Sequence, residues 1–473
     1  MKIEDNANRV NKFEYYKSLE TSSSFGNENR CSVKKLLEAR EKEDYDTEHV
    51  INGRVMNIRK LKSESYIFLR DFDSDLQVHI PEIINKDFLS VIDTGDFIEL
   101  KGKTICKSES DELIFEARDY LLAAKCRFIF PKQLTDKRKR YENRFLDLTI
   151  NKKSISTVKS GALINRVIRK TLWENGYEEY STPALFTSYN GGVSTPFETH
   201  FDALKKTAYL KATSEIYLKQ LITAGFDSVF EIAGSFRNEG MDRFHIPGFP
   251  LLEVYKAFAN ADDMLDLNLQ MIENILKEYN GEAKLLARDG SILDVKKEDW
   301  IRIDAYSYLK EEKGIDILAD IQTLREEANK LGVHCSENSG PATVIGDLID
   351  RFIREGSVEP IIVTHLPSSM TPLMKKNAED ERFSERYWLY VNGIDISDIG
   401  SEQDDCKEQC LELQKQFDLM HEAYPHIKVN EDIIKVASYG LPRTGGIGFS
   451  LSRMLMALEN LDDVRETPVF PYI

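Results

Sequence analysis

The sequence lacks long hydrophobic runs: no stretch approaches the roughly 18 uncharged apolar residues that a membrane helix requires. The N-terminal segment MKIEDNANRVNKFEYYK also has no apolar core of the kind found in secretory signal peptides. We therefore expect a cytoplasmic protein with no membrane partner.

Cysteine is scarce, with six residues scattered over 473 positions. So few thiols in so long a chain argue for reduced cysteines rather than a disulfide framework. Cys406 and Cys410 lie four positions apart, which is not the CxxC spacing of zinc ligands, and no second pair accompanies them. The sequence therefore argues against structural zinc.

Basic residues are outnumbered, with 63 Lys and Arg against 80 Asp and Glu and a net charge of −17. Such a charge argues against non-specific nucleic-acid binding, so a nucleic-acid site would need a local basic footprint. The length predicts two or three domains, and the 41% hydrophobic content is ordinary for a soluble globular protein.

Composition divides the chain into four parts. Residues 1–46 form an N-terminal extension, with a loop predicted at 22–30 and a short helix at 34–43. Residues 47–130 are rich in Val, Ile, Phe and Tyr between short turns, which predicts a small all-β domain of about five strands. An oligonucleotide-binding (OB) barrel is one such fold, although other small barrels or sandwiches have similar sequences.

A basic linker follows at 131–150, and its charged part, PKQLTDKRKRYENR, is either a solvated connector or a phosphate contact. Residues 151–473 alternate between helical and strand patterns. Helices are expected at 160–176 and 262–279, and strand-like segments at 177–185, 226–238 and 249–258.

The segment from Ser228 to Phe258 contains the chemistry that the residues alone suggest. Two strand-like runs flank a loop that bears Arg237, Glu239 and His245. An arginine can clamp a phosphate, a glutamate can accept from an adenine amino group, and a histidine can reach a polyphosphate. These residues predict an ATP site, while a hairpin with a charged turn is the alternative.

Several ordered segments resemble the class II lysyl-tRNA synthetases. FRNEG with the following HxP and FxxLE resembles the second signature motif of class II enzymes. NGYEEYSTPAL resembles the first motif, and GLPRTGGIGFSLSRMLMAL resembles the third. The resemblance extends over roughly residues 48 to 473, through RFLDLTIN, YNGGVSTPFETHFDAL, YLKATSEIYLKQL, HLPSSMTPLMKKN and DVRETPVFPYI.

The resemblance implies an α+β protein, in which an OB-fold anticodon-binding barrel precedes an antiparallel-sheet catalytic domain. It also implies a homodimer, ATP and Mg²⁺ as cofactors, and lysine and tRNA as partners. The implied reaction forms an aminoacyl-adenylate and then transfers the acyl group to tRNA, by positioning and charge neutralisation rather than a covalent nucleophile.

Site residues follow from the resemblance, position by position. On the ATP side, Arg237 would hold the α-phosphate, Glu239 would meet adenine, Arg453 would stack on the adenine, and His245 would face the polyphosphate. Asp395 falls at a Mg²⁺ position. The amino-acid side would comprise Gly191 and Gly192 in a mobile loop, Glu215 at the α-amino group, Glu253 and Tyr255 in the pocket wall, and Glu402 at the lysine ε-amino group.

The carboxylates bear on the choice of amino acid. Glu215, Glu253 and Glu402 together favour an amine-bearing substrate such as lysine over an acidic one, because a buried charge needs an opposite charge. Taken without the resemblance, Glu402 in GSEQDD is also compatible with an exposed acid in a polar turn.

The chain departs from the family pattern at positions close to the expected site. Phe244 and Gly248 stand where an arginine and a glutamate are expected, and Arg243 is a candidate substitute one position away. Other departures lie at Trp388, Asp395, Asp398, Gly400, Ser450 and Ser452. Each lost phosphate or metal contact would cost about 1.5–3 kcal/mol.

Three functions are therefore compatible with the sequence. The first is a lysine–tRNA ligase. The second is a diverged paralogue that adenylates lysine or a related amine for a non-tRNA acceptor, and the third is a catalytically impaired tRNA-binding protein. The retained β-barrel favours a role with RNA, because such barrels offer aromatic stacking to single-stranded bases.

Overall fold

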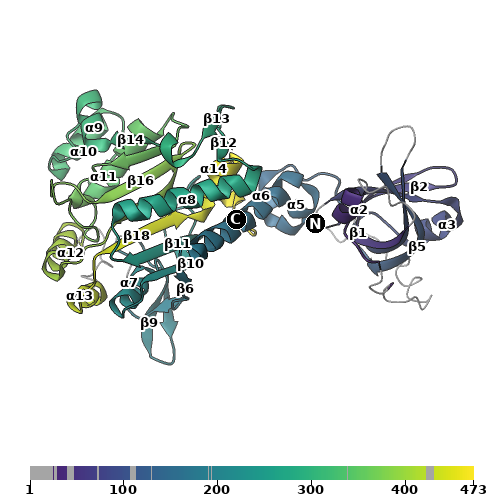
Figure 1. Ribbon diagram of the computed structural model, residues 1–473, viewed down its shortest axis with the longest axis horizontal. Coiled ribbons are helices and arrows are strands. Elements are labelled where there is room, and N and C mark those ends of the chain that lie inside the picture. The colour runs from purple at the N-terminus through teal and green to yellow at the C-terminus, as the bar shows by residue number, and fades with distance from the viewer. Residues whose placement is uncertain are drawn as a thin grey trace. The chain divides into compact units, whose positions relative to one another are not determined.

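The computed structural model describes residues 25, 29–39, 47–71, 74–106, 113–128, 130–189, 191–192, 194–337, 339–421 and 431–473. Its contacts divide the chain into two compact units, and the boundary in the sequence lies between Gln133 and Leu134 (Figure 1). Each unit has a hydrophobic core of its own. Among the described residues, no helix is long and apolar enough to span a membrane.

The N-terminal unit is a closed five-stranded barrel with the strand order β1-β2-β3-β5-β4, consistent with an OB-fold. Alternate residues of β2 show how the sequence forms it: Ile67 and Leu69 are fully buried, while Phe68 between them is exposed on the outer surface. The elements are α2 (Val33–Ala39), β1 (Glu48–Lys60), β2 (Ser65–Arg70), β3 (Asp75–Ile80), α3 (Glu82–Val91), β4 (Phe97–Cys106) and β5 (Leu113–Ala124).

The predicted barrel of about five strands is confirmed, and its segment at 66–80 proves to be two paired strands. The helix expected at 34–43 is present as α2, and residues 40–43 lie outside the described part of the chain. Most of the loop expected at 22–30 also lies outside it.

The C-terminal unit is built on an eight-stranded sheet. Its six central strands are antiparallel, and the pairs β14–β15 and β10–β6 at the two edges are parallel. In sheet order the strands are β14 (Ile301–Asp304), β15 (Ile361–Thr364), β16 (Arg386–Val391), β17 (Ile394–Ser401), β18 (Thr444–Ser450), β11 (Gly248–Ala257), β10 (Ser228–Phe236) and β6 (Glu178–Glu179). The expected antiparallel sheet is thus confirmed, with parallel strands added at its edges.

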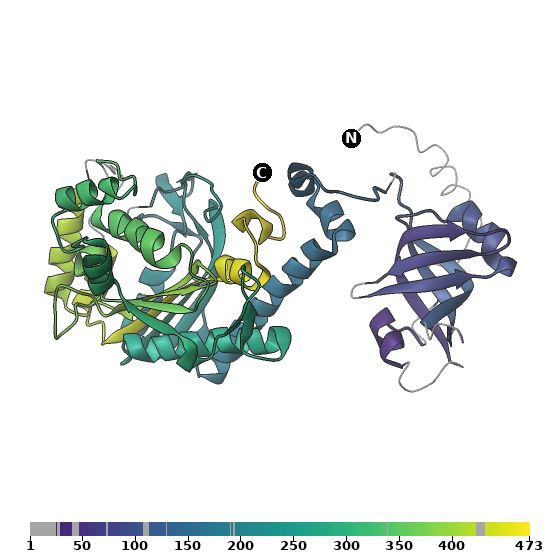
Figure 2. The same ribbon diagram turned by 90° about the horizontal axis from the view of Figure 1, so that it is seen from above.

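Three helices cover one face of this sheet: α6 (Lys152–Glu174), α8 (Ala261–Asn280) and α14 (Leu451–Glu459) (Figure 2). Their apolar sides form the main core with alternate strand residues such as Leu252 and Val254. Helix α8 begins at a capping box in which Asn260 and Asp263 satisfy each other's backbone N–H groups, and it ends at Gly281 with φ +86°. The two helices predicted at 160–176 and 262–279 are confirmed.

The remaining helices lie elsewhere around the sheet. Helices α9 (Ala305–Lys313), α10 (Ile321–Lys330) and α11 (Pro341–Ile349) pack with β15, and the π-helical turn Asp350–Arg354 follows α11. Helices α7 (Glu215–Thr223), α12 (Cys406–Met420) and α13 (Glu431–Ser438) share a smaller core. A separate hairpin pairs β12 (Lys284–Leu286) with β13 (Ile292–Asp294).

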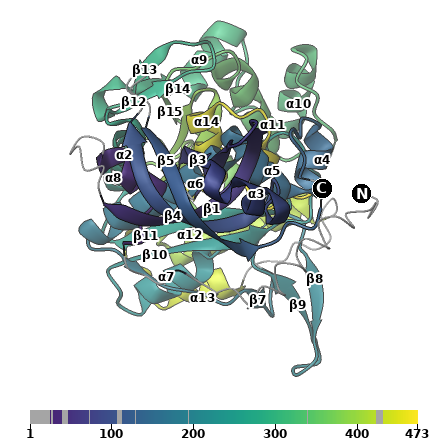
Figure 3. The ribbon, with the colours of Figure 1, turned by 90° about the vertical axis from the view of Figure 1, so that its right-hand side faces the viewer.

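The predicted strand at 177–185 is only partly correct. The structure has a two-residue strand, β6, and then β7 (Leu185–Phe186), which belongs to a small sheet with β9 (Lys206–Leu210) and β8 (Glu198–Phe201). This small sheet extends away from the large one as a long hairpin (Figure 3).

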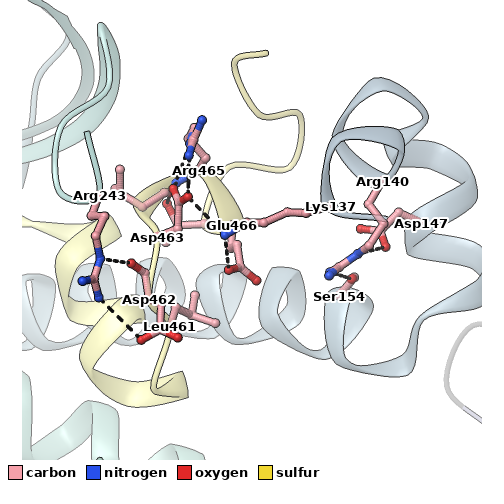
Figure 4. A network of polar contacts seen from close by, with 12 residues as sticks. Lys137, Arg140, Asp147, Ser154, Arg243, Leu461, Asp462, Asp463, Arg465 and Glu466 are labelled. Atoms are coloured by element: carbon pink, nitrogen blue, oxygen red, sulfur yellow. Dashed lines mark hydrogen bonds and ion pairs between the residues drawn. The ribbon is translucent and has the colours of Figure 1, made fainter. Parts of the chain in front are cut away.

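The basic linker is folded rather than free. It forms α4 (Lys137–Glu142) and α5 (Arg144–Ile150), and Asp136 caps α4 by accepting from the Lys139 backbone N–H. Lys137 pairs with Asp463 and Glu466, and Arg140 donates to Asp147 and Ser154 (Figure 4). These two cations are therefore used inside the unit, and a solvated connector does not describe them.

Candidate active site

A cavity of about 770 Å³ opens on the face of the large sheet that α8 does not cover. Strand alternation places its walls: on β11, Leu252 and Val254 point into the core, whereas Leu251 and Glu253 line the cavity. Ser450 on β18 lines it as well. Nine predicted site residues line this one cavity: Gly191, Gly192, Glu215, Arg237, Glu239, His245, Glu253, Asp395 and Arg453.

Arg237 and Glu239 follow the end of β10 at one side of the cavity. The Arg237 guanidinium lies 5.4 Å from the Phe249 ring centroid, and its Nε atom is buried with no hydrogen-bond partner among the described residues. A buried N–H without an acceptor costs free energy, which a ligand oxygen would recover. Arg237 is thus prepared for an anionic ligand.

Arg453 lies in the first turn of α14, where Ser450 caps the helix by accepting from the Arg453 backbone N–H. One Arg453 nitrogen forms an ion pair with Asp395, and Nη2 donates to His245 Nε2 at 3.1 Å. His245 Nδ1 then faces Asp242 at 2.8 Å, so this nitrogen carries the proton. A helix N-terminus with an arginine at its mouth favours a phosphate.

Asp395 is 40% exposed toward the cavity. Desolvation by the surrounding protein raises the pKa of its carboxyl, Arg453 opposes that rise, and Asp350 adds to it. Asp350 also lines the cavity, so two carboxylates face its phosphate end. Among the described residues, no group of three or more His, Cys, Asp or Glu is placed to hold a metal by itself.

The other end of the cavity carries Glu215 and Glu253. Glu253 is buried on β11 and accepts from the Thr213 hydroxyl at 2.5 Å and from the Ser214 backbone N–H. Burial raises the pKa of Glu253 to about 7 in spite of the Thr213 hydrogen bond, and the charge of Glu215 raises it further. Glu215 forms an ion pair with Lys219, which does not itself line the cavity.

Tyr255 and Glu402 do not line the cavity and lie one layer deeper. Glu402 is 1% exposed, so the structure excludes the exposed polar turn that the sequence left open. A Cβ at Gly446 would lie 2.2 Å from Glu402 Oε1 and 2.9 Å from the Tyr255 ring. Glycine at this position therefore allows the carboxylate and the ring to pack directly against the β18 backbone.

Sequence reasoning missed Lys219, whose ammonium lies between Glu215 and Glu402. A signal was available, because Lys219 is four residues after Glu215 in a helix whose neighbours Ile216 and Ile222 are buried. A charge inside an apolar helical pattern needs a buried partner.

It also missed a second cluster made by the unusual residues at 388 and 398. Arg386 donates to Asp398 through two nitrogens at 2.8 and 2.6 Å, and Trp388 Nε1 donates to the same carboxylate at 3.1 Å. The Arg386 guanidinium stacks over the Trp388 ring at 5.0 Å. The cavity-facing carboxylate of Asp398 is therefore already neutralised by the chain.

The structure does not support Arg243 as a substitute for the missing arginine. Arg243 is not among the residues that line the cavity. Its side chain turns toward the C-terminal segment, where Nε donates to the Asp462 carbonyl at 3.1 Å (Figure 4). The Val464 backbone N–H in turn donates to the Arg243 carbonyl, so this residue anchors the loop.

Gly191 and Gly192 both line the cavity. Gly192 has φ +57°, and a Cβ at Gly191 would lie 2.1 Å from the Tyr189 hydroxyl, so both positions favour glycine. Asn190 and Val193 beside them lie outside the described residues.

Comparison with known proteins agrees with this geometry. A sequence model of the family described as "tRNA synthetases class II (D, K and N)" matches residues 136–473. The lysine–tRNA ligase of Staphylococcus saprophyticus is 30% identical over 453 residues, which cover 92% of this chain and 89% of that protein. Those of Halalkalibacterium halodurans and Thermotoga maritima are 29% and 31% identical, over 93% and 89% of this chain and 90% and 85% of theirs. The chain therefore belongs to the class II aminoacyl-tRNA synthetases, within the lysyl-tRNA synthetase family.

Proposed function

We propose that this protein activates lysine with ATP and transfers the lysyl group to tRNA(Lys) in the cytoplasm. The observation that supports this most directly is one cavity with arginines and a helix N-terminus at one end and the carboxylates of Glu215 and Glu253 at the other. The relatives named lysine–tRNA ligase, which match nine-tenths of the chain, support the same reaction.

In the first step, a lysine carboxylate oxygen attacks the α-phosphorus of ATP, forming lysyl-adenylate and releasing pyrophosphate. In the second, a ribose hydroxyl at the tRNA 3′ end attacks the acyl carbon, and AMP leaves. The protein accelerates both steps by holding the reactants in line and neutralising charge.

On the ATP side, Arg237 contacts the α-phosphate through its guanidinium group, whose buried Nε atom has no hydrogen-bond partner among the described residues. Arg453 stacks on adenine, Glu239 accepts from the adenine amino group, and His245 faces the polyphosphate. Arg453 gives up or shares its contact with Asp395 when ATP binds, because both residues line the same end of the cavity.

The residues at this end fit a magnesium ion. Mg²⁺ binds through one or two carboxylates and keeps waters and phosphate oxygens as its other ligands. Asp395 would hold the ion, and Asp350 is the second carboxylate facing the cavity there. A bound Mg²⁺ would neutralise the polyphosphate charge.

On the amino-acid side, Glu215 and Glu253 receive the α-ammonium group of lysine. Glu402 and Tyr255, which are buried behind the cavity wall, receive the ε-ammonium group. The loop at Gly191 and Gly192 covers the bound amino acid. Three carboxylates at one end of the cavity suit a diamino acid and disfavour an acidic one.

Two further proposals concern assembly. The N-terminal barrel binds the anticodon, with outward aromatic residues such as Phe68 on β2 as stacking surfaces. The protein forms a homodimer, which the large hydrophobic residues Trp173, Leu185 and Phe258 support, since they are 54%, 43% and 72% exposed in the single chain.

The decisive experiment is amino-acid-dependent exchange of pyrophosphate into ATP, with lysine and ornithine first in the panel. Exchange with lysine, followed by lysine attachment when tRNA(Lys) is added, is the expected result. Absence of exchange with every amino acid, from protein shown to be folded, would overturn the proposal.

A further inference from the structure

Lys219 is a cation enclosed within the amino-acid end of the site. It lies on α7, and its side chain is 3% exposed. Its Nζ atom is 2.6 Å from Glu215 Oε1 and 2.5 Å from Glu402 Oε2, and it lies 5.9 Å from the Tyr255 ring centroid. The chain's own ammonium thus contacts the carboxylates assigned to the two ammonium groups of the substrate.

The groups around Lys219 come from several elements. Glu215 is on α7, Glu253 and Tyr255 are on β11, and Glu402 follows β17. Asp398 on β17 and Arg386 on β16 are more distant, and they pair with each other through two hydrogen bonds.

With all three glutamates ionised, they and the one lysine give this end of the site a charge of −2. A bound lysine brings two ammonium groups to this end, while its carboxylate faces the ATP, so the charges match when Lys219 is present and the three carboxylates have ionised. Without Lys219, three carboxylates at short range would repel one another, and at least one would take up a proton.

We propose that Lys219 is a positioning residue of the amino-acid site, an in-chain ammonium that bridges Glu215 and Glu402, offsets their mutual repulsion and keeps them correctly spaced for a diamino acid. This inference rests on the proposed lysine activation. Two observations support it: a lysine is buried here in a pair of short ion pairs, and burial raises the pKa of Glu402 to about 7 while the charge of Lys219 opposes that rise.

The test begins with the wild-type protein, in which lysine-dependent pyrophosphate exchange must be present; its absence would reject the proposed function and not the role of Lys219. The variant Lys219→Met keeps the length of the side chain and removes the charge. We expect kcat/KM for lysine to fall at least tenfold at pH 7 while the KM for ATP stays within twofold. We also expect the rise of kcat/KM with pH to move upward by at least one pH unit, because the carboxylates then ionise later.

Lys125→Met is the matched control. Lys125 is likewise a buried lysine between two carboxylates, Asp93 and Asp96 at 2.8 Å each, but it belongs to the N-terminal barrel. It should leave exchange and its pH profile unchanged. If Lys219→Met lowers activity only in proportion to the folded fraction, with the wild-type pH profile, the proposal is wrong.

A double-mutant cycle covers the case in which Lys219→Met folds poorly. Glu402→Gln combined with Lys219→Met removes both charges of the pair, so no uncompensated charge from this pair stays buried. If Lys219 acts through Glu402, the double variant should lose no more than about threefold beyond Glu402→Gln alone in kcat/KM for lysine. If the loss in kcat/KM of the double variant equals the product of the losses in the two single variants, the proposal is wrong.

Discussion

Arg453 and Asp395 form a direct ion pair across the phosphate end of the cavity. The two residues come from α14 and β17, and each has been assigned to a different part of bound Mg²⁺–ATP. In the free protein each neutralises the other, which lowers the cost of leaving two charges in a poorly solvated cavity. ATP binding therefore has to replace the Arg453–Asp395 ion pair before new contacts to ATP and Mg²⁺ can form.

The ion pair predicts the behaviour of Asp395→Asn. Removing the carboxylate deletes the proposed Mg²⁺ ligand, and losing one charge-assisted contact of about 1.5–3 kcal/mol corresponds to about a 10- to 150-fold change. We expect the Mg²⁺ concentration for half-maximal exchange to rise by about tenfold or more. Titration of Mg²⁺ at fixed ATP measures this directly.

Asp462→Asn is a suitable control, since Asp462 is 79% exposed and pairs with Arg243 outside the cavity. An unchanged Mg²⁺ requirement together with tighter ATP binding would show instead that Asp395 only restrains Arg453.

The sequence predicted the fold and the position of the cavity because both depend on patterns among residues that are close together in the sequence. Hydrophobic alternation located β10 and β11, and the family motifs placed Arg237 after β10 and Arg453 in the helix that follows β18. Glu402 is buried, and its proposed role at the amino-acid site stays a prediction.

What the sequence could not give are pairings between distant residues. Arg243 was a reasonable substitute for a missing arginine by position, yet its side chain turns to Asp462, 219 residues away. The Arg386–Asp398 and Lys219–Glu402 pairs likewise depend on sheet register and helix placement. Charged residues are compatible with many partners until the fold selects one.

Glu253 predicts a specific dependence of stability on pH. Burial raises the pKa of its carboxyl to about 7, against about 4.5 when unfolded. Between these values the folded protein binds more protons than the unfolded chain, so this group lowers stability as pH rises from 4.5 to 7. The total effect is at most about 3 kcal/mol.

Glu253→Gln removes this titration. We compare melting temperatures in the absence of amino acid. The difference between the variant and the wild type should increase from pH 4.5 to pH 7 and then stay constant. Thermal unfolding at four pH values measures it, and the variant should lose lysine binding throughout. A difference in melting temperature that does not vary with pH would contradict the titration assigned to Glu253.

Gly400 and Met374 are predicted to be coupled. A Cβ at Gly400 would lie 2.4 Å from Met374 Sδ and 3.1 Å from the Glu385 carbonyl oxygen, so the methionine occupies the space a side chain would need. Gly400→Ala should destabilise the protein by about 1–3 kcal/mol, and Met374→Ala in the same chain should recover part of this loss.

Urea denaturation of the two single variants and the double variant measures the coupling. Gly234→Ala on β10 is the control, because its Cβ would meet only Phe236 ring atoms at 3.4 Å or more. Additive effects at positions 400 and 374 would show that the methionine does not fill this space.

The outer face of the barrel provides the last prediction. On β2, Tyr66 and Phe68 point outward between buried residues; Tyr66 stacks on His79 at 5.0 Å, whereas Phe68 is 44% exposed. Stacking of one base on an aromatic residue is worth about 1–3 kcal/mol, so Phe68→Ala should raise the KM for tRNA about 5- to 150-fold. Lysine-dependent pyrophosphate exchange should not change, because that reaction needs only the C-terminal cavity.

Ile83→Ala is the control on the same unit, since Ile83 is 87% exposed on α3 and should affect neither reaction. A loss of exchange in Phe68→Ala would indicate damage to the fold, and unchanged charging would place the RNA contact on another part of the barrel.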